Sequence, residues 1–131
     1  MNYNSAPLDR GQTIMDTSTK YKVVFQLTDN DTFIQKSMLR QLTNLLEAME
    51  DVDVEVVTHS YGIDPLLAGT PFQDDIRKLE KRGVTFLVCE NTLRQEKHGR
   101  SRLLDSVHTV PAGVAHIVRR QAEGWSYIKA G

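Results

Sequence analysis

The chain has few of the residues from which metal sites and disulfides are built. Cys89 is the only cysteine among 131 residues, so no disulfide can form within the chain, which fits a reducing compartment. The four histidines are spread along the sequence without the close spacing of a metal site on one element. We therefore expect no bound metal and no cofactor.

A charge excess of one sign and a long apolar segment are also missing. The 16 basic and 17 acidic residues nearly balance and are scattered, so electrostatics give no basis for binding nucleic acid or an anionic membrane. No stretch has the length of a membrane span, and residues 1–20 lack the apolar core of a signal peptide. We expect a cytoplasmic protein with a flexible N-terminal tail at 1–20 and a single domain at 21–131.

Two common catalytic signatures are absent. The polar group from Thr28 to Asp31 follows the first expected strand, where dinucleotide-binding and phosphate-binding loops need glycines. The Gly-x-Ser-x-Gly turn of serine hydrolases does not occur either. Nucleotide chemistry and serine hydrolysis are therefore disfavoured.

Strand patterns and helix patterns alternate along the rest of the chain. Apolar runs predict strands at 21–27, 52–58, 84–89, 107–110 and 125–129. Helical spacing, capping residues and prolines predict helices that open near Thr32, Thr70, Thr92 and Pro111. This alternation is typical of an α/β fold with a mainly parallel five-stranded sheet and helices on both faces.

The stretch around Cys89 is the most informative part of the sequence. Cys89 ends a buried strand, while Asn91 and Thr92 are good N-cap residues and Thr92 forms a capping-box pattern with Gln95. A helix that starts two or three residues after the sulfur would direct N–H groups at it and favour a nucleophilic thiolate. The alternative is a buried cysteine that acts as a small apolar side chain.

Other polar residues are expected on the same side of the molecule. The carboxyl ends of parallel strands share one rim of a sheet, which places Asp29, Asn30 and His59 on the side of Cys89. His59 could transfer protons or line a pocket, or it could simply bind a loop carbonyl. Asp29 and Asn30 also suit the start of a helix. A Cys-His-Asp hydrolase would require His59 within hydrogen-bond distance of the thiol.

Five short segments carry a family resemblance through their order and spacing. They are Asn44-Leu45-Leu46, Val54–His59 followed by Leu66-Leu67, Gly83-Val84 leading into Val88–Leu93, Val110–Val114, and Gly124–Lys129. Together they resemble the DsrE/DsrF-like family of small sulfur-relay proteins, over residues 22–129. The resemblance implies a three-layer α/β/α sandwich that assembles as homotrimers or hexamers.

The resemblance also implies a role for the cysteine. Cys89 matches the residue that carries sulfur as a persulfide between protein thiols, so sulfur donor and acceptor proteins are the expected partners. The favoured hypothesis is a sulfur carrier or sulfurtransferase, with amides near Asn91 and Thr92 stabilising the sulfur anion and His59 beside it. Two alternatives stay open: a small-ligand binding or assembly module without catalysis, and a cysteine-dependent hydrolase.

Overall fold

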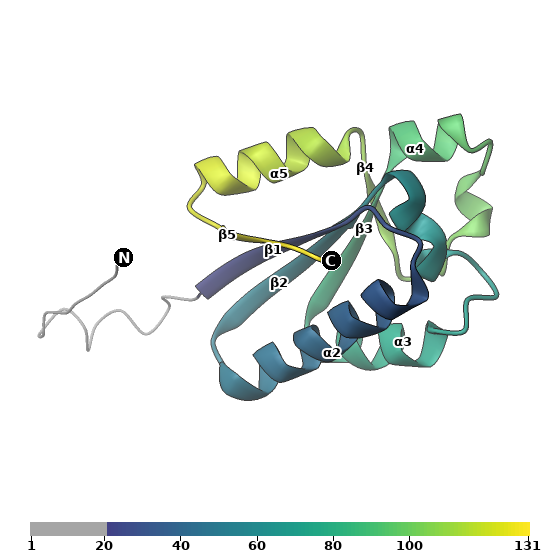
Figure 1. Cartoon of the computed structure of the whole chain (residues 1–131). Helices are drawn as coiled ribbons and strands as arrows, with labels where there is room; N and C mark the ends of the chain where they lie inside the picture. The colour runs from purple at the N-terminus through teal and green to yellow at the C-terminus, as the bar shows by residue number, and fades with distance from the viewer. Residues whose placement is uncertain (1–20) are drawn as a thin grey trace, which may run out of the picture.

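Five strands form one parallel sheet at the centre of the molecule (Figure 1). The computed structural model describes residues 21–131, so the expected N-terminal tail lies outside the described residues. In spatial order the strands are β4 (His108–Val110), β3 (Val84–Cys89), β2 (Val52–Thr58), β1 (Tyr21–Leu27) and β5 (Ser126–Lys129). All four neighbouring pairs are parallel, which confirms the predicted sheet and brings the carboxyl ends of β1, β2 and β3 together on one rim.

Helices cover both faces of this sheet, which gives the predicted three layers (Figure 1). The longer ones are α2 (Thr32–Ala48), α3 (Gln73–Lys81) and α5 (Gly113–Ala122), and the short ones are α4 (Glu90–Gln95), η2 (Ser60–Leu66) and η3 (Arg100–Arg102). Helices α2 and α3 lie on one face and α5 lies on the other, while α4 follows the end of β3. Within residues 21–131, no helix combines the length and hydrophobicity that a bilayer span requires.

The two faces of the sheet bury two separate apolar clusters. Successive strand side chains point to opposite faces, so Phe25 packs in the larger cluster with Met38 of α2, while its neighbour Val24 belongs to the smaller one. The smaller cluster lies under α5 and includes Val57 and Ile117. Burying one such side chain contributes about 1.5–3 kcal/mol, so these clusters fix which face each helix covers.

The helix starts differ in detail from the capping patterns. Helix α2 begins where predicted, but the residue before it caps it, since the Asp31 carboxylate accepts a hydrogen bond from the Phe33 N–H (2.8 Å). Helix α3 begins at Gln73, because Thr70 instead caps the turn that precedes the helix. Helix α5 begins at Gly113 rather than at the preceding proline.

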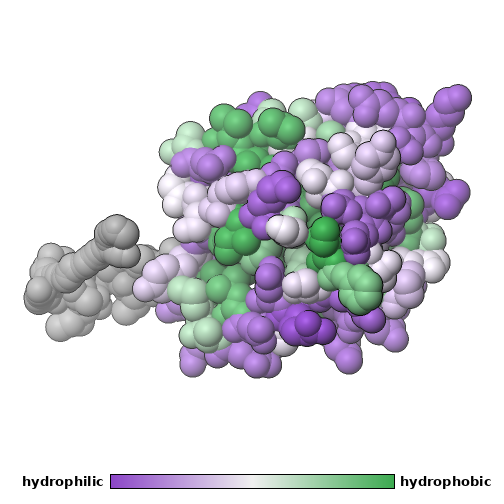
Figure 2. Space-filling view, in the orientation of Figure 1, coloured by the Kyte–Doolittle hydropathy of each residue, from purple (hydrophilic) through white to green (hydrophobic). Residues whose placement is uncertain are grey.

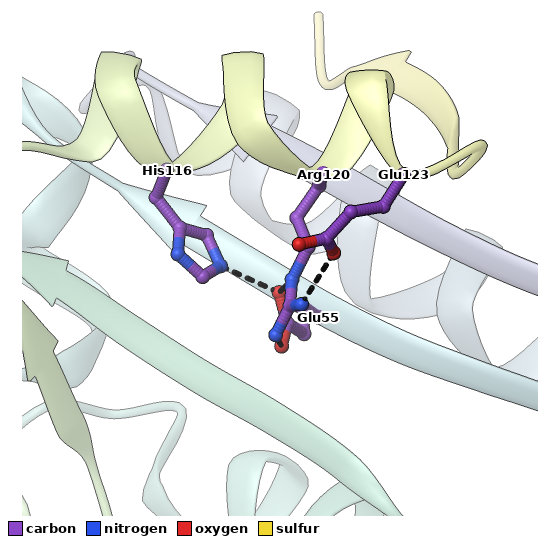
Figure 3. Close-up of polar contacts among 4 residues, drawn as sticks. All are labelled: Glu55, His116, Arg120 and Glu123. Carbon is purple, nitrogen blue, oxygen red and sulfur yellow. Dashed lines mark hydrogen bonds and ion pairs between the residues drawn. The ribbon is translucent and has the colours of Figure 1, made fainter.

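A charged network fastens α5 to the sheet (Figure 3). Glu55 of β2 accepts two hydrogen bonds from the Arg120 guanidinium (2.6 and 2.9 Å) and contacts His116 Nε2 (2.7 Å). Arg120 also pairs with Glu123 (2.8 Å), and its guanidinium lies 4.5 Å from the ring centre of Trp125. Burial raises the pKa of Glu55, but Arg120 and His116 together lower it by more, so the pKa lies below its ordinary value.

Replacing Glu55 should weaken this attachment. The Glu55→Gln variant leaves Arg120 and His116 without their anion, and we expect it to lower the free energy of unfolding by about 2 kcal/mol, between the values for exposed and buried ion pairs. A carboxyl whose folded pKa is lowered stabilises the fold above its unfolded pKa, near 4.3, and this contribution disappears as pH falls through the folded value. Urea unfolding at several pH values should therefore show the two proteins converging in acid.

The matched control is Glu123→Gln, which removes the more exposed partner of Arg120 and should change the free energy of unfolding by less than about 0.5 kcal/mol. Equal losses in both variants, or a Glu55→Gln effect that does not depend on pH, would contradict the account.

Candidate functional site

Cys89 occupies the junction between β3 and α4. It is the last residue of the strand, and the helix begins at the next residue, Glu90. The predicted capping box is therefore wrong, because Thr92 lies inside the first turn of α4 instead of preceding it. The earlier start brings the N–H groups of that turn closer to the sulfur than the sequence pattern predicts.

Four donors hydrogen-bond the sulfur of Cys89. They are the backbone N–H groups of Gly113, Thr92 and Asn91 and the Thr92 hydroxyl. The Thr92 oxygen is itself an acceptor for the Ser60 N–H (3.0 Å), which leaves its hydrogen free to point at the sulfur. Ser60 adopts a left-handed backbone (φ 54°) at this point. The first turns of two helices and the loop after β2 thus converge on one thiol.

These hydrogen bonds affect the pKa of the Cys89 thiol. Burial raises the pKa of Cys89, but the hydrogen bonds from Gly113, Thr92 and Asn91 lower it by more, so the pKa lies below that of a free thiol. A thiolate is the nucleophilic form of cysteine and also the better leaving group. The residue is only 6% exposed in the single chain, so the sulfur lies in a confined site.

Gly113 lets His59 and Cys89 come together. A β-carbon at this glycine would lie 3.3 Å from His59 Cδ2, 3.4 Å from Cys89 Cβ and 3.1 Å from a methyl of Val57. The imidazole and the thiol-bearing carbon are therefore separated by about the space of one methyl group. The strand ends alone place both residues on one rim of the sheet, and the glycine explains how α5 can approach both of them.

The surroundings of His59 favour its uncharged form. It follows β2 directly, and burial lowers its pKa below the ordinary value. Its Nε2 lies 2.8 Å from Gln26 Nε2, and the Gln26 oxygen accepts a hydrogen bond from the Tyr127 hydroxyl. Sequence reasoning missed both partners, although a glutamine inside an otherwise buried strand is a signal, because buried amides need hydrogen-bond partners.

Asp29 and Asn30, the other expected site residues, do not take part in the hydrogen bonds around the thiol. The Asp29 carboxylate accepts from the Asp31 N–H (2.8 Å), and Asn30 is exposed. Among the described residues, no hydrogen bond joins either of them to His59 or Cys89. In the same part of the chain, no three His, Cys, Asp or Glu side chains are grouped to hold a metal ion. The arrangement provides a hydrogen-bonded thiol and a neutral imidazole.

Comparison with known proteins adds family and fold. The model of the DsrE/DsrF-like family matches residues 21–130. No curated protein matches at a significant level. Several solved structures share the fold, and the protein of unknown function MTH1491 from Methanobacterium thermoautotrophicum is 38% identical, with a TM-score of 0.82 over 84% of this chain and 99% of that one.

Two further structures are more distant in sequence. The ychN protein from E. coli is 14% identical with a TM-score of 0.71, over 85% of this chain and 99% of that one. The conserved protein of unknown function BT1422 from Bacteroides thetaiotaomicron is 11% identical with a TM-score of 0.67, over 82% and 93%. At such identities these two support the fold alone.

The role of the Thr92 hydroxyl can be tested with Thr92→Val, which keeps the shape of the side chain. Loss of one hydrogen bond to an anion is worth about 1.5–3 kcal/mol, so the rate of Cys89 alkylation by a small reagent at mildly acidic pH should fall about tenfold or more. At alkaline pH, where both proteins carry thiolate, the rates should converge. Stopped-flow alkylation across pH measures both effects.

Thr43→Val is the matched control, since this hydroxyl only donates to the Leu39 carbonyl of α2 (3.2 Å). Its alkylation profile should equal that of the wild type. A Thr92→Val profile that also equals the wild type would show that the hydroxyl does not stabilise the thiolate.

Proposed function

Because the chain belongs to the DsrE/DsrF-like family, which is generally linked to sulfur relay, we propose that it carries sulfur as a persulfide on Cys89 and transfers it between protein thiols. The observation that supports this most is the set of hydrogen bonds on the Cys89 sulfur from the first turns of α4 and α5. These donors favour an anion on sulfur without the help of a metal or a second cysteine.

The proposed chemistry is thiol exchange. The Cys89 thiolate attacks the outer sulfur of a donor persulfide, an S–S bond forms on Cys89, and the donor cysteine leaves as its thiolate. An acceptor thiolate then attacks the outer sulfur on Cys89, and the Cys89 thiolate leaves. Each step breaks one S–S bond and makes another, so no external oxidant or reductant is required. The lowered pKa of Cys89 favours its departure in the second step.

In this proposal His59 lines the site beside the sulfur. Its neutral ring leaves the stabilisation of the anion to the N–H groups of Gly113, Asn91 and Thr92. A cysteine hydrolase is a weaker candidate, because the Nε2 of His59 is engaged by Gln26 and no described contact provides it with a carboxylate. A non-catalytic binding or assembly module is favoured by one observation, the 6% exposure of Cys89.

We also propose that the chain self-associates through the edge strand β5. A groove between α2 and β5 is lined by Phe25, Phe33 and Ile128, among others, and the last two are 83% and 40% exposed. Figure 2 has apolar surface over α5 and in the region between β5 and α2. All four residues of β5 are exposed, and unpaired strand edges pair readily with another strand. A second copy would pair this edge and cover the groove.

Sulfur loading has a direct test in the intact protein. Incubation of the folded chain with a small-molecule persulfide donor, followed by intact mass spectrometry, should add one sulfur atom that a reductant removes. Since Cys89 is the only cysteine, the Cys89→Ser variant should gain none. If only the urea-unfolded chain takes up sulfur, the thiol is not reachable in the fold, and the binding-module hypothesis replaces sulfur relay.

Self-association can be tested with Phe33→Asp. Removing a large apolar side chain from an interface costs about 1.5–3 kcal/mol, so the dissociation constant measured by analytical ultracentrifugation should rise tenfold or more. Tyr21→Asp is a control at the amino end of β1, outside the residues that line the groove, where Tyr21 is 66% exposed, and it should leave the assembly unchanged. A wild-type chain that sediments as a monomer at all concentrations would contradict the proposal.

A further inference from the structure

A chain of side-chain hydrogen bonds runs from the edge of the sheet to the imidazole of His59. The Tyr127 hydroxyl of β5 donates to the Gln26 oxygen, and the Gln26 nitrogen lies 2.8 Å from His59 Nε2. Strand β1 lies between β5 and β2 in the sheet, so Gln26 connects residues of its two neighbours. Neither Gln26 nor Tyr127 touches the thiol in the described contacts, which leaves His59 as the group through which they act.

The chemistry of an amide determines where the His59 proton lies. An amide oxygen only accepts and an amide nitrogen only donates. Because the Gln26 oxygen accepts from Tyr127, its nitrogen faces His59 and donates to Nε2. His59 Nε2 must therefore carry no proton, so the single proton of the neutral ring lies on Nδ1. A fully protonated ring would place two donors face to face.

We propose that Gln26 and Tyr127 are positioning residues that hold His59 as the neutral tautomer protonated on Nδ1. The burial of His59 acts in the same direction, since it lowers the pKa of the ring. Titratable groups next to this unit include Cys89 of β3, which lies on the other side of Gly113 from His59, and Tyr127 itself.

The consequence, which rests on the proposed sulfur relay, concerns the reactivity of Cys89. A positively charged imidazole beside the thiolate would lower the thiol pKa strongly, as in thiolate–imidazolium pairs. Nucleophilicity falls with the pKa, and the best attacking thiol has a pKa near the working pH. A neutral His59 therefore keeps Cys89 suited both to attack a donor persulfide and to leave from its own.

The test is the protonation state of His59 in the full-length protein, measured by ¹⁵N NMR of the imidazole. In the wild type, Nε2 should resonate as an unprotonated nitrogen and Nδ1 as a protonated one. In Gln26→Glu, a carboxylate that accepts replaces the amide that donates, so Nε2 should become protonated and the titration of His59 should shift to higher pH. The Cys89 alkylation profile should change shape with that titration.

Tyr127→Phe provides a second variant that keeps the bulk of the ring. Without the hydroxyl the Gln26 amide can rotate by half a turn, and the His59 signals should report a mixture of the two neutral tautomers. In the Gln26→Asn variant, the ring should likewise not be held in one pure form. A wild-type ring protonated on Nε2, or a tautomer unchanged in Gln26→Glu, would overturn the proposal. Because this readout needs no sulfur donor, it is separate from the test of sulfur loading.

Discussion

The hydrogen bonds on the sulfur of Cys89 are the interaction on which the rest of the site depends. Three of the donors belong to Asn91 and Thr92 in the first turn of α4, which the chain forms directly after β3, but the fourth is the Gly113 N–H of α5 on another element. The position of α5 therefore matters as much as that of the cysteine. The ion pair between Glu55 and Arg120 fastens this helix to β2, and the missing side chain of Gly113 allows its close approach.

A protein can stabilise a sulfur anion in two ways, with a neighbouring positive charge or with neutral N–H dipoles, and this site uses the second. In a thiolate–imidazolium pair the positive charge of the imidazolium dominates, and the pKa of the thiol falls strongly. Here neutral N–H dipoles surround the sulfur, while burial favours the uncharged form of His59, whose ring is bound to Gln26. Such a site favours an anion without making it a poor nucleophile, which suits the sulfur transfer that we propose.

Local patterns in the sequence were enough to predict the strands, the parallel sheet and the position of Cys89 at the end of β3, because apolar periodicity and strand-end topology fix them. The start of α4 was not predictable in the same way. Thr92 has the sequence signature of a cap, but its hydroxyl is engaged by Ser60 and Cys89 instead. Capping patterns cannot register such a contact between distant segments.

Contacts across the sheet explain the residues that sequence reasoning missed. Tyr127 and Gln26 are 101 positions apart and meet only because β5 returns beside β1.

The most direct measurement of the central claim is the pKa of Cys89 itself, followed through its ¹³Cβ chemical shift in the folded chain and in the chain unfolded by urea. The account predicts a lower pKa in the folded protein. An equal or higher value in the fold would contradict it.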